Sequence, residues 1–127
     1  MSRPTVAIVG ASSDREKYGN KSVRAHVRNG YEVYPINPKG GMIEGLKVYQ
    51  SLSDVPVRPL DRISLYVPSE IAMRFLPQIA AVGCDELWFN PGSEGETVLN
   101  EARRLGLEPL VGCSIVDLGA RPEQFAS

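Results

Sequence analysis

The sequence has few of the residues from which metal centres and disulfide frameworks are built. It contains two cysteines, Cys84 and Cys113, and one histidine, His26. The cysteines form no Cys-x-x-Cys pair and have no pair of histidines near them, which argues against a zinc site or a disulfide. We therefore expect reduced thiols and no bound metal.

Long apolar runs and an excess of charge of one sign are also missing. The first apolar run, residues 6–9, is too short for a signal-peptide core or a membrane span. The formal net charge of −1 lacks the basic excess of non-specific nucleic-acid binders, and no basic amphipathic stretch indicates a membrane surface. We expect a cytoplasmic protein that binds neither nucleic acid nor membranes, and in which a local cluster of groups holds any anion.

The residues that are present are typical of one globular domain. The 127 residues are 43% apolar and 23% charged, as in ordinary soluble proteins. A chain of this length buries enough surface to fold without covalent cross-links. We expect a single domain over residues 1–127.

Short β-branched runs alternate with stretches that carry apolar residues at helical spacing. Buried strands are predicted at residues 5–9, 31–36, 62–67, 86–89 and 108–111. Helices are predicted around Val23, over residues 71–82 with a kink at Pro77, and from a capping box at Ser93 to Gly106. Residues 38–59 read as an irregular connection with a short helix near 51–54. The alternation predicts a Rossmann-like, doubly wound α/β fold: a mainly parallel five-stranded sheet with helices on both faces.

In such a fold the ligand lies beyond the carboxyl ends of the strands. The first of these ends is Gly10-Ala11-Ser12-Ser13, where a glycine turn exposes backbone N–H groups to a phosphate and the next helix adds its positive dipole end. The dinucleotide fingerprint is incomplete, since Ser12 and Arg15 replace its second and third glycines. A plain tight turn is the alternative.

The next candidates flank the first helix and the second strand. Lys17 could contact phosphates and Tyr18 could cover a ribose or an adenine, although a solvated helix entrance fits them equally well. Asn37-Pro38-Lys39 follows the second strand, where NAD-binding domains place a carboxylate for the ribose hydroxyls. The lysine favours a phosphorylated ribose, as in coenzyme A or NADP. A surface turn is the alternative.

Two further strand ends open helices and are candidates to line the ligand. They are Val67-Pro68, followed by Ser69 as a natural N-cap, and Pro91-Gly92 within the run from Asn90 to Ser93. Helix capping alone would also explain both.

Other reactive side chains are predicted to have structural roles. His26 is interpreted as structural or exposed, and no Ser–His–Asp or Cys–His arrangement is assembled around it. Cys84 is placed at the far end of the sheet, and Trp88 is interpreted as core. Cys113 follows the fifth strand and could approach the thiol of a bound pantetheine, although a small buried hydrophobe is the simpler interpretation. No catalytic residue is therefore assigned.

Together these segments resemble the small bacterial and archaeal coenzyme A-binding proteins, which are stand-alone relatives of the coenzyme A-binding domain of the succinyl-CoA synthetase α-subunit. The matching stretches are Val-Gly-Ala-Ser12, Lys17-Tyr-Gly19, residues 30–39, residues 45–49, Val67-Pro68, Leu87-Trp88, Pro91-Gly92 and Cys113. The resemblance implies that the glycine turn holds the pyrophosphate, that Lys39 lies near the adenosine end, and that Val67-Pro68 lies against the nucleotide. The phosphorylated histidine of the synthetase has no counterpart here.

The function expected from the sequence is non-catalytic binding of coenzyme A or an acyl-CoA. The alternatives are an NADP-binding oxidoreductase, because a lysine after the second strand also suits a 2′-phosphate, and a redox-sensing subunit. Hydride transfer needs a second substrate beside the nicotinamide, for which one domain leaves little room. The sequence leaves open whether residues 115–127 join a homo-oligomer.

Overall fold

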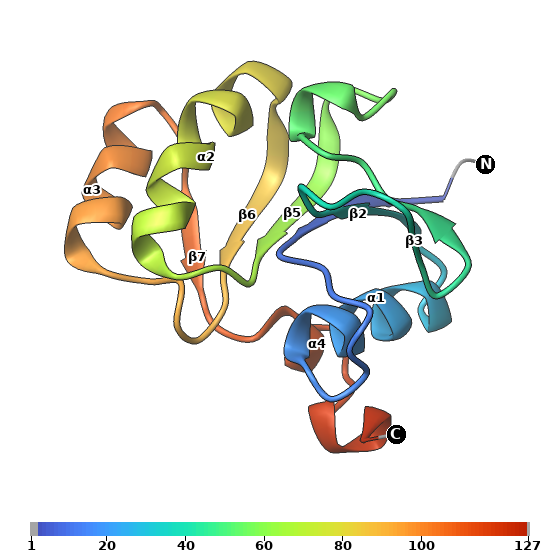
Figure 1. Cartoon of the computed structure of the whole chain (residues 1–127). Helices are drawn as coiled ribbons and strands as arrows, with labels where there is room; N and C mark the ends of the chain where they lie inside the picture. The colour runs from blue at the N-terminus through green and yellow to red at the C-terminus, as the bar shows by residue number, and fades with distance from the viewer. Residues whose placement is uncertain (1–2, 127) are drawn as a thin grey trace.

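A parallel β-sheet organises the computed structural model, which describes residues 3–126. Its five strands are β1 (Thr5–Val9), β2 (Glu32–Ile36), β5 (Leu60–Leu65), β6 (Cys84–Phe89) and β7 (Pro109–Val111). They lie in the order β2-β1-β5-β6-β7, and every neighbouring pair is parallel (Figure 1). The chain therefore adds β2 on one side of β1 and then crosses over to add β5, β6 and β7 on the other.

Helices cover both faces of this sheet. The faces are distinct because successive side chains of a strand point to opposite sides. On one side Ala7 and Val9 join a buried cluster with α2 (Ser69–Val82), α3 (Glu96–Arg104) and the short 3₁₀ helix η1 (Leu52–Asp54). On the other side Val6 and Ile8 pack against Val23 of α1 (Tyr18–Arg28). The predicted doubly wound α/β fold is confirmed (Figure 1).

The last segments also pack on the α1 side of the sheet. Ile115 of α4 (Ser114–Asp117) and Phe125 of η2 (Pro122–Phe125) form a small buried cluster with Ala25. The guanidinium groups of Arg24 and Arg28 lie 5.7 and 4.9 Å from the centre of the Phe125 ring. Neither α4 nor η2 was predicted, because each is too short to show a helical period.

Every predicted strand except β1 has a boundary that differs from prediction, and two helix starts differ as well. β5 was predicted at 62–67 and β6 at 86–89, but pairing of Leu60 with Cys84 extends both strands toward the amino edge. The Ser93 capping box is wrong: α3 begins at Glu96, and the Ser93 hydroxyl instead donates to the carbonyl oxygens of Leu65 and Val67. Ser69 is not an N-cap either, since Pro68 holds that position and Ser69 is the first helical residue.

The segment predicted as irregular contains a small hairpin. Strands β3 (Met42–Ile43) and β4 (Leu46–Lys47) are antiparallel, and Glu44 and Gly45 form the two-residue turn with φ of 50° and 78°. Two positive φ angles are what the tightest hairpin turn requires. The short helix expected near residues 51–54 is present as η1.

Candidate functional site

The candidate site is the edge at which the parallel strands end. The chain leaves β1 and β5, which are neighbours, in opposite directions along the sheet, and such a switch point is where open α/β sheets bind ligands. Gly10 follows β1 and Asn37 follows β2, while Tyr66 follows β5. Asn90 and Cys113 continue the row beyond β6 and β7.

Gly10 is required by the backbone at this switch point. Its φ is +88°, and a Cβ atom would stand 2.8 Å from the carbonyl oxygen of Tyr66 and 3.0 Å from Cγ1 of Val67. Its N–H donates to the carbonyl oxygen of Ile36 at 3.2 Å. The turn is therefore fixed by β2 on one side and by the end of β5 on the other.

The helix that follows approaches this turn through a second glycine. A Cβ atom on Gly19 would lie 2.2 Å from the carbonyl oxygen of Gly10, so only glycine lets α1 pack here. Sequence reasoning looked for this glycine at position 15 and took the fingerprint as incomplete. The role is filled after a longer loop, and the signal that could have found it was the glycine in the first turn of a predicted helix.

Asn20 holds the loop between Gly10 and α1. It is fully buried, and its Nδ2 donates to the Ser12 carbonyl oxygen at 2.8 Å and to Oε2 of Glu44 in the hairpin at 3.1 Å. Ser13, Lys17 and Tyr18 project from the same region with exposed side chains. The loop thus has a fixed backbone and accessible side chains, an arrangement suited to contact an anion through N–H groups.

Asn37 connects the second strand end to the first. Its Nδ2 donates to the Ala11 carbonyl oxygen at 2.8 Å, while its Oδ1 accepts from the backbone N–H of Lys39 at 2.9 Å. Pro38 and Lys39 are exposed. Lys39 opens onto a hollow of about 510 Å³ to which Lys47 also contributes. The arrangement joins Asn37 to the Gly10 turn and leaves two cations beside it.

A second pocket lies beyond β5, β6 and β7, on the other side of the Gly10 turn. It has a volume of about 340 Å³ and is lined by Tyr18, Tyr66, Asn90, Pro91, Cys113, Val116, Pro122 and Glu123. We call it the β7-side pocket. Three residues singled out in the sequence, Tyr18, Pro91 and Cys113, therefore come together. Val116 and Pro122 were missed because they belong to the two unpredicted helices.

The floor of the β7-side pocket is a buried hydrogen-bond network. Nδ2 of Asn90 donates to the Ser64 hydroxyl at 2.7 Å and to the Leu65 carbonyl oxygen at 2.9 Å, and its Oδ1 accepts from the Ser114 N–H at 2.8 Å. The Tyr66 hydroxyl bonds to the Ser114 hydroxyl at 2.9 Å. Burial raises the pKa of Tyr66, against the hydrogen bonds that lower it. The tyrosine stays neutral at physiological pH.

The other predicted site residues lie at the rim. Cγ1 of Val67 lies against the Gly10 turn, whereas Pro68 is exposed at the start of α2. Gly92 has a φ of +100° and donates its N–H to Oε1 of Glu94 at 2.9 Å, which keeps it in a surface turn. It does not line the β7-side pocket, unlike Pro91.

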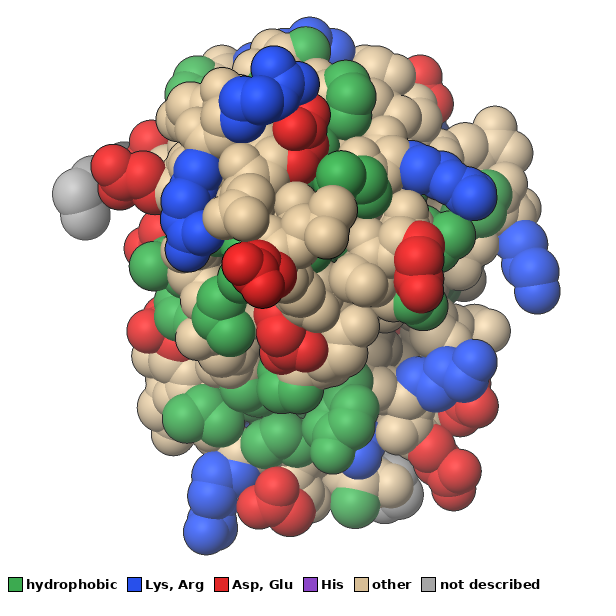
Figure 2. Space-filling view, turned by 90° about the vertical axis from the view of Figure 1, so that its left-hand side faces the viewer, with side chains coloured by type: hydrophobic (Ala, Val, Ile, Leu, Met, Phe, Trp, Pro, Cys, Tyr) green, Lys and Arg blue, Asp and Glu red, His purple; other side chains and the backbone are tan. Residues whose placement is uncertain are grey.

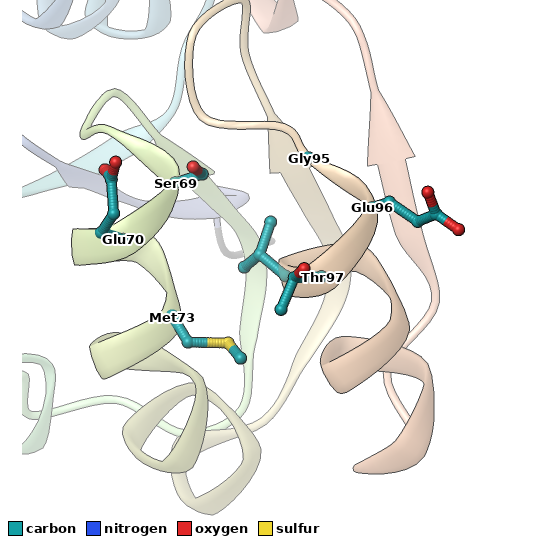
Figure 3. A pocket seen from close by; sticks show the side chains of 7 residues that line it. Ser69, Glu70, Met73, Gly95, Glu96 and Thr97 are labelled. Atoms are coloured by element: carbon teal, nitrogen blue, oxygen red, sulfur yellow. The ribbon is translucent and has the colours of Figure 1, made fainter.

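A third pocket lies between the amino ends of α2 and α3 (Figure 3). It has a volume of about 470 Å³, and Ser69, Glu70, Met73, Gly95, Glu96, Thr97 and Val98 line it. Figure 3 shows Met73 pointing between the two helices, whereas Glu96 points away. Two carboxylates and no cation line this pocket, so it is unsuited to a phosphate.

His26 is buried away from the strand ends. Its Nδ1 donates to the Ser22 carbonyl oxygen at 2.8 Å, and its Nε2 faces Nη1 of Arg62 at 3.3 Å. Burial lowers the pKa of His26 to about 4, with a smaller contribution from the Arg62 charge. The ring is therefore neutral at pH 7 and has no access to a ligand. Within residues 3–126, no group of three His, Cys, Asp or Glu side chains is placed to hold a metal ion.

Trp88 and Cys84 also belong to the body of the sheet. Trp88 was predicted as core but is only half-buried, and the Arg62 guanidinium lies over its ring at 5.3 Å. Cys84 begins β6 at the opposite edge, and burial raises the pKa of its thiol to about 12. In the described part of the chain, none of the helices has the length and apolar character needed to cross a membrane.

Comparison with known proteins agrees with the resemblance seen in the sequence. Residues 4–119 match the family model described as "CoA binding domain". The α subunit of "Acetate--CoA ligase [ADP-forming] I" from Pyrococcus furiosus is 36% identical over 81 residues, which are 59% of this chain and 16% of that subunit. This chain therefore spans about a sixth of the length of that relative.

Two solved structures have the same fold over nearly the whole chain. A "conserved hypothetical protein" from Pyrococcus furiosus is 33% identical with a TM-score of 0.80, covering 91% of this chain and 99% of that one. A "hypothetical protein" from Pyrococcus horikoshii OT3 is 26% identical with a TM-score of 0.83, covering 98% and 85%.

Proposed function

This chain belongs to the family of CoA binding domains, and we propose from this that it binds coenzyme A or an acyl-CoA along the carboxyl edge of its sheet without catalysing a reaction. The observation that carries the proposal is the Gly10 turn. Two glycines without room for a Cβ bring α1 onto this turn, at the switch point where this fold binds phosphates.

The pyrophosphate is placed at the Gly10 turn, over residues 10–13. The first turn of α1 carries no acidic residue of its own, and the nearby carboxylate of Glu44 is paired with Asn20 and Arg15. Lys17 stands at the N-cap of this helix with an exposed side chain. The backbone N–H groups and the lysine together suit a doubly charged group.

The adenosine end is placed beside Asn37. No carboxylate follows β2 here, in contrast to domains that bind an unphosphorylated ribose. Lys39 and Lys47 border the hollow next to Asn37 together with Asp54, so a ribose phosphate would find two cations and one carboxylate there. This favours coenzyme A or NADP over NAD, and the family favours coenzyme A over NADP.

The absence of catalysis is proposed from the side chains around the site. His26 is buried and neutral, and Glu96 and Glu101 belong to the surface of α3. The carboxamide of Asn90 and the hydroxyl of Tyr66 are engaged in the pocket floor. We infer a carrier or sensor of the coenzyme, located in the cytoplasm.

Titration calorimetry with coenzyme A, NADP and NAD tests the proposal. Coenzyme A should bind far better than NAD, because only its ribose carries the phosphate that Lys39 and Lys47 would contact. Equal affinities for coenzyme A and NAD would overturn the proposal. Tighter binding of NADP than of coenzyme A would favour the alternative of an NADP-binding subunit, which the two lysines alone would also allow.

A further inference from the structure

The β7-side pocket lies where the far end of a bound coenzyme would reach. The strand order places Asn37, Gly10 and Tyr66 in a row, with Asn90 and Cys113 beyond them. If the adenosine lies at β2 and the phosphates at β1, the arm of the coenzyme extends over β5, β6 and β7. Three strand spacings amount to about 14 Å, a distance that the extended two-amide arm can cross.

The polar groups on the floor of this pocket are already paired with the protein. Asn90 uses both amide hydrogens and its oxygen within the floor, and the Tyr66 hydroxyl bonds to Ser114. A ligand would have to break these buried bonds to obtain a hydrogen bond from them, which is costly. The hydrogen-bonding groups of the floor are therefore already satisfied, which favours an apolar group of the ligand in this pocket.

The walls of the pocket are mainly apolar. Pro91 and Pro122 line it together with Tyr18 and Val116, whose side chains are 58% and 57% exposed. Figure 2 shows hydrophobic side chains gathered low on the side of the molecule that carries β7. An apolar group in this pocket would remove part of that surface from water, which is favourable.

The only charged residue among those that line the pocket is acidic. Glu123 stands at the rim, and neither lysine nor arginine lines the pocket. A second carboxylate in the pocket would be repelled by Glu123 and would find no cation there. A neutral occupant is therefore favoured over an anionic one.

We propose that the β7-side pocket holds the acyl group of a short, uncharged acyl-CoA, so that the protein discriminates acylated from free coenzyme. This inference rests on the proposed binding of coenzyme A and adds a ligand class to it. It also assigns Tyr18 to the acyl end, in place of the ribose or adenine expected from the sequence. The pocket volume of about 340 Å³ limits the chain that fits.

Calorimetry with coenzyme A and its acetyl, propionyl and butyryl thioesters tests the proposal. A buried methylene contributes about 0.8 kcal/mol, so each added carbon should tighten binding roughly fourfold. Succinyl-CoA, with as many carbons as butyryl-CoA but a carboxylate at its end, should bind at least tenfold more weakly than butyryl-CoA. If free coenzyme A binds but chain length has no effect, the acyl pocket is wrong while the proposed function stands. If no coenzyme A species binds, the proposed function itself fails.

Two substitutions and one control variant locate the effect in the pocket. Val116→Phe should remove the preference for butyryl-CoA by filling the pocket, and should leave the affinity for free coenzyme A within about twofold. Val111→Phe is the matched control, because Val111 is equally exposed at 55% but does not line the pocket. Glu123→Gln should narrow the difference between succinyl-CoA and butyryl-CoA. An unchanged preference in Val116→Phe, or equal effects of both valine variants, would overturn the proposal.

Discussion

At the scale of single residues, the site depends on glycines, which have no Cβ atom, as much as on the side chains around them. Gly10 needs its positive φ, and Gly19 needs only space, since nothing beyond hydrogen fits against the Gly10 carbonyl oxygen. Gly10 could be singled out from the sequence because it ends a β-branched run. Gly19 could be noticed in the first turn of a predicted helix, but the reason it must be glycine appears only in the fold, where the helix approaches a turn nine residues earlier.

Replacing Gly19 tests that approach. Gly19→Ala should weaken coenzyme A binding at least tenfold, because the methyl group would push α1 away from the Gly10 turn, where we propose that the phosphates bind, and should lower the denaturation midpoint. Gly95→Ala is the control: its Cβ would meet its nearest neighbour at 3.6 Å, an ordinary contact, and it also stands at the start of a helix. Calorimetry and urea unfolding would measure both variants. Normal binding by Gly19→Ala would place the phosphate turn elsewhere.

Lys39 gives a second test at the same scale. A hydrogen bond to a charged group contributes about 1.5–3 kcal/mol, so Lys39→Ala should weaken coenzyme A binding roughly 10- to 100-fold. Dephospho-coenzyme A lacks the 3′-phosphate and should bind the variant about as well as the wild type. Equal losses for the two ligands would show that Lys39 acts on another part of the ligand, and no loss for either would leave residues 37–39 as an ordinary turn.

At the scale of elements, prediction succeeded where the buried apolar residues of a segment recur at strand or helix spacing. All five strands were predicted from short runs rich in β-branched and apolar residues, and the errors are confined to boundaries set by pairing, as at Leu60 and Cys84. The two short helices that wall the β7-side pocket carry no such pattern. Asp117 of α4 instead pairs at 2.5 Å with Arg62, a buried residue of β5 that also pairs with Glu86 at 2.8 Å.

The ion pair between Arg62 and Asp117 predicts how firmly α4 is held against β5. Asp117→Asn should destabilise the fold by about 1 kcal/mol, less than for a fully buried pair, because Asp117 is 43% exposed and Glu86 still compensates the arginine. It should also speed alkylation of Cys113, the residue before α4. Glu101→Gln, which breaks an exposed pair with Arg104 on α3, is the control and should change neither quantity measurably. Identical alkylation rates in Asp117→Asn and wild type would show that the pair does not hold α4.

At the scale of the whole molecule, the sequence predicted the architecture and the segments that lie along the carboxyl edge of the sheet. The glycine turn and the residues after β2 could be placed because a parallel sheet aligns all its carboxyl ends. The β7-side pocket could be found only in the folded structure, since Tyr18 and Pro122 meet there from opposite ends of the chain. The same holds for His26, whose burial against Arg62 follows from packing and not from its neighbours in sequence.

Burial of His26 predicts that the whole molecule loses stability in mild acid. The pKa of His26 is lowered to about 4, whereas an unfolded histidine has a pKa of about 6.5. Between these values the unfolded chain binds a proton that the folded chain does not, so the free energy of unfolding falls as the pH drops through this window and the effect levels off near pH 4. The difference of about 2.5 pKa units corresponds to about 3 kcal/mol. His26→Gln should remove this part of the pH dependence, seen as a smaller difference between urea midpoints at pH 7 and pH 4.5.

Carboxylates that titrate in the same range act in both the variant and the wild type, so the comparison isolates the contribution of the histidine. An unchanged pH dependence in the variant would mean that His26 does not stay neutral in the folded protein.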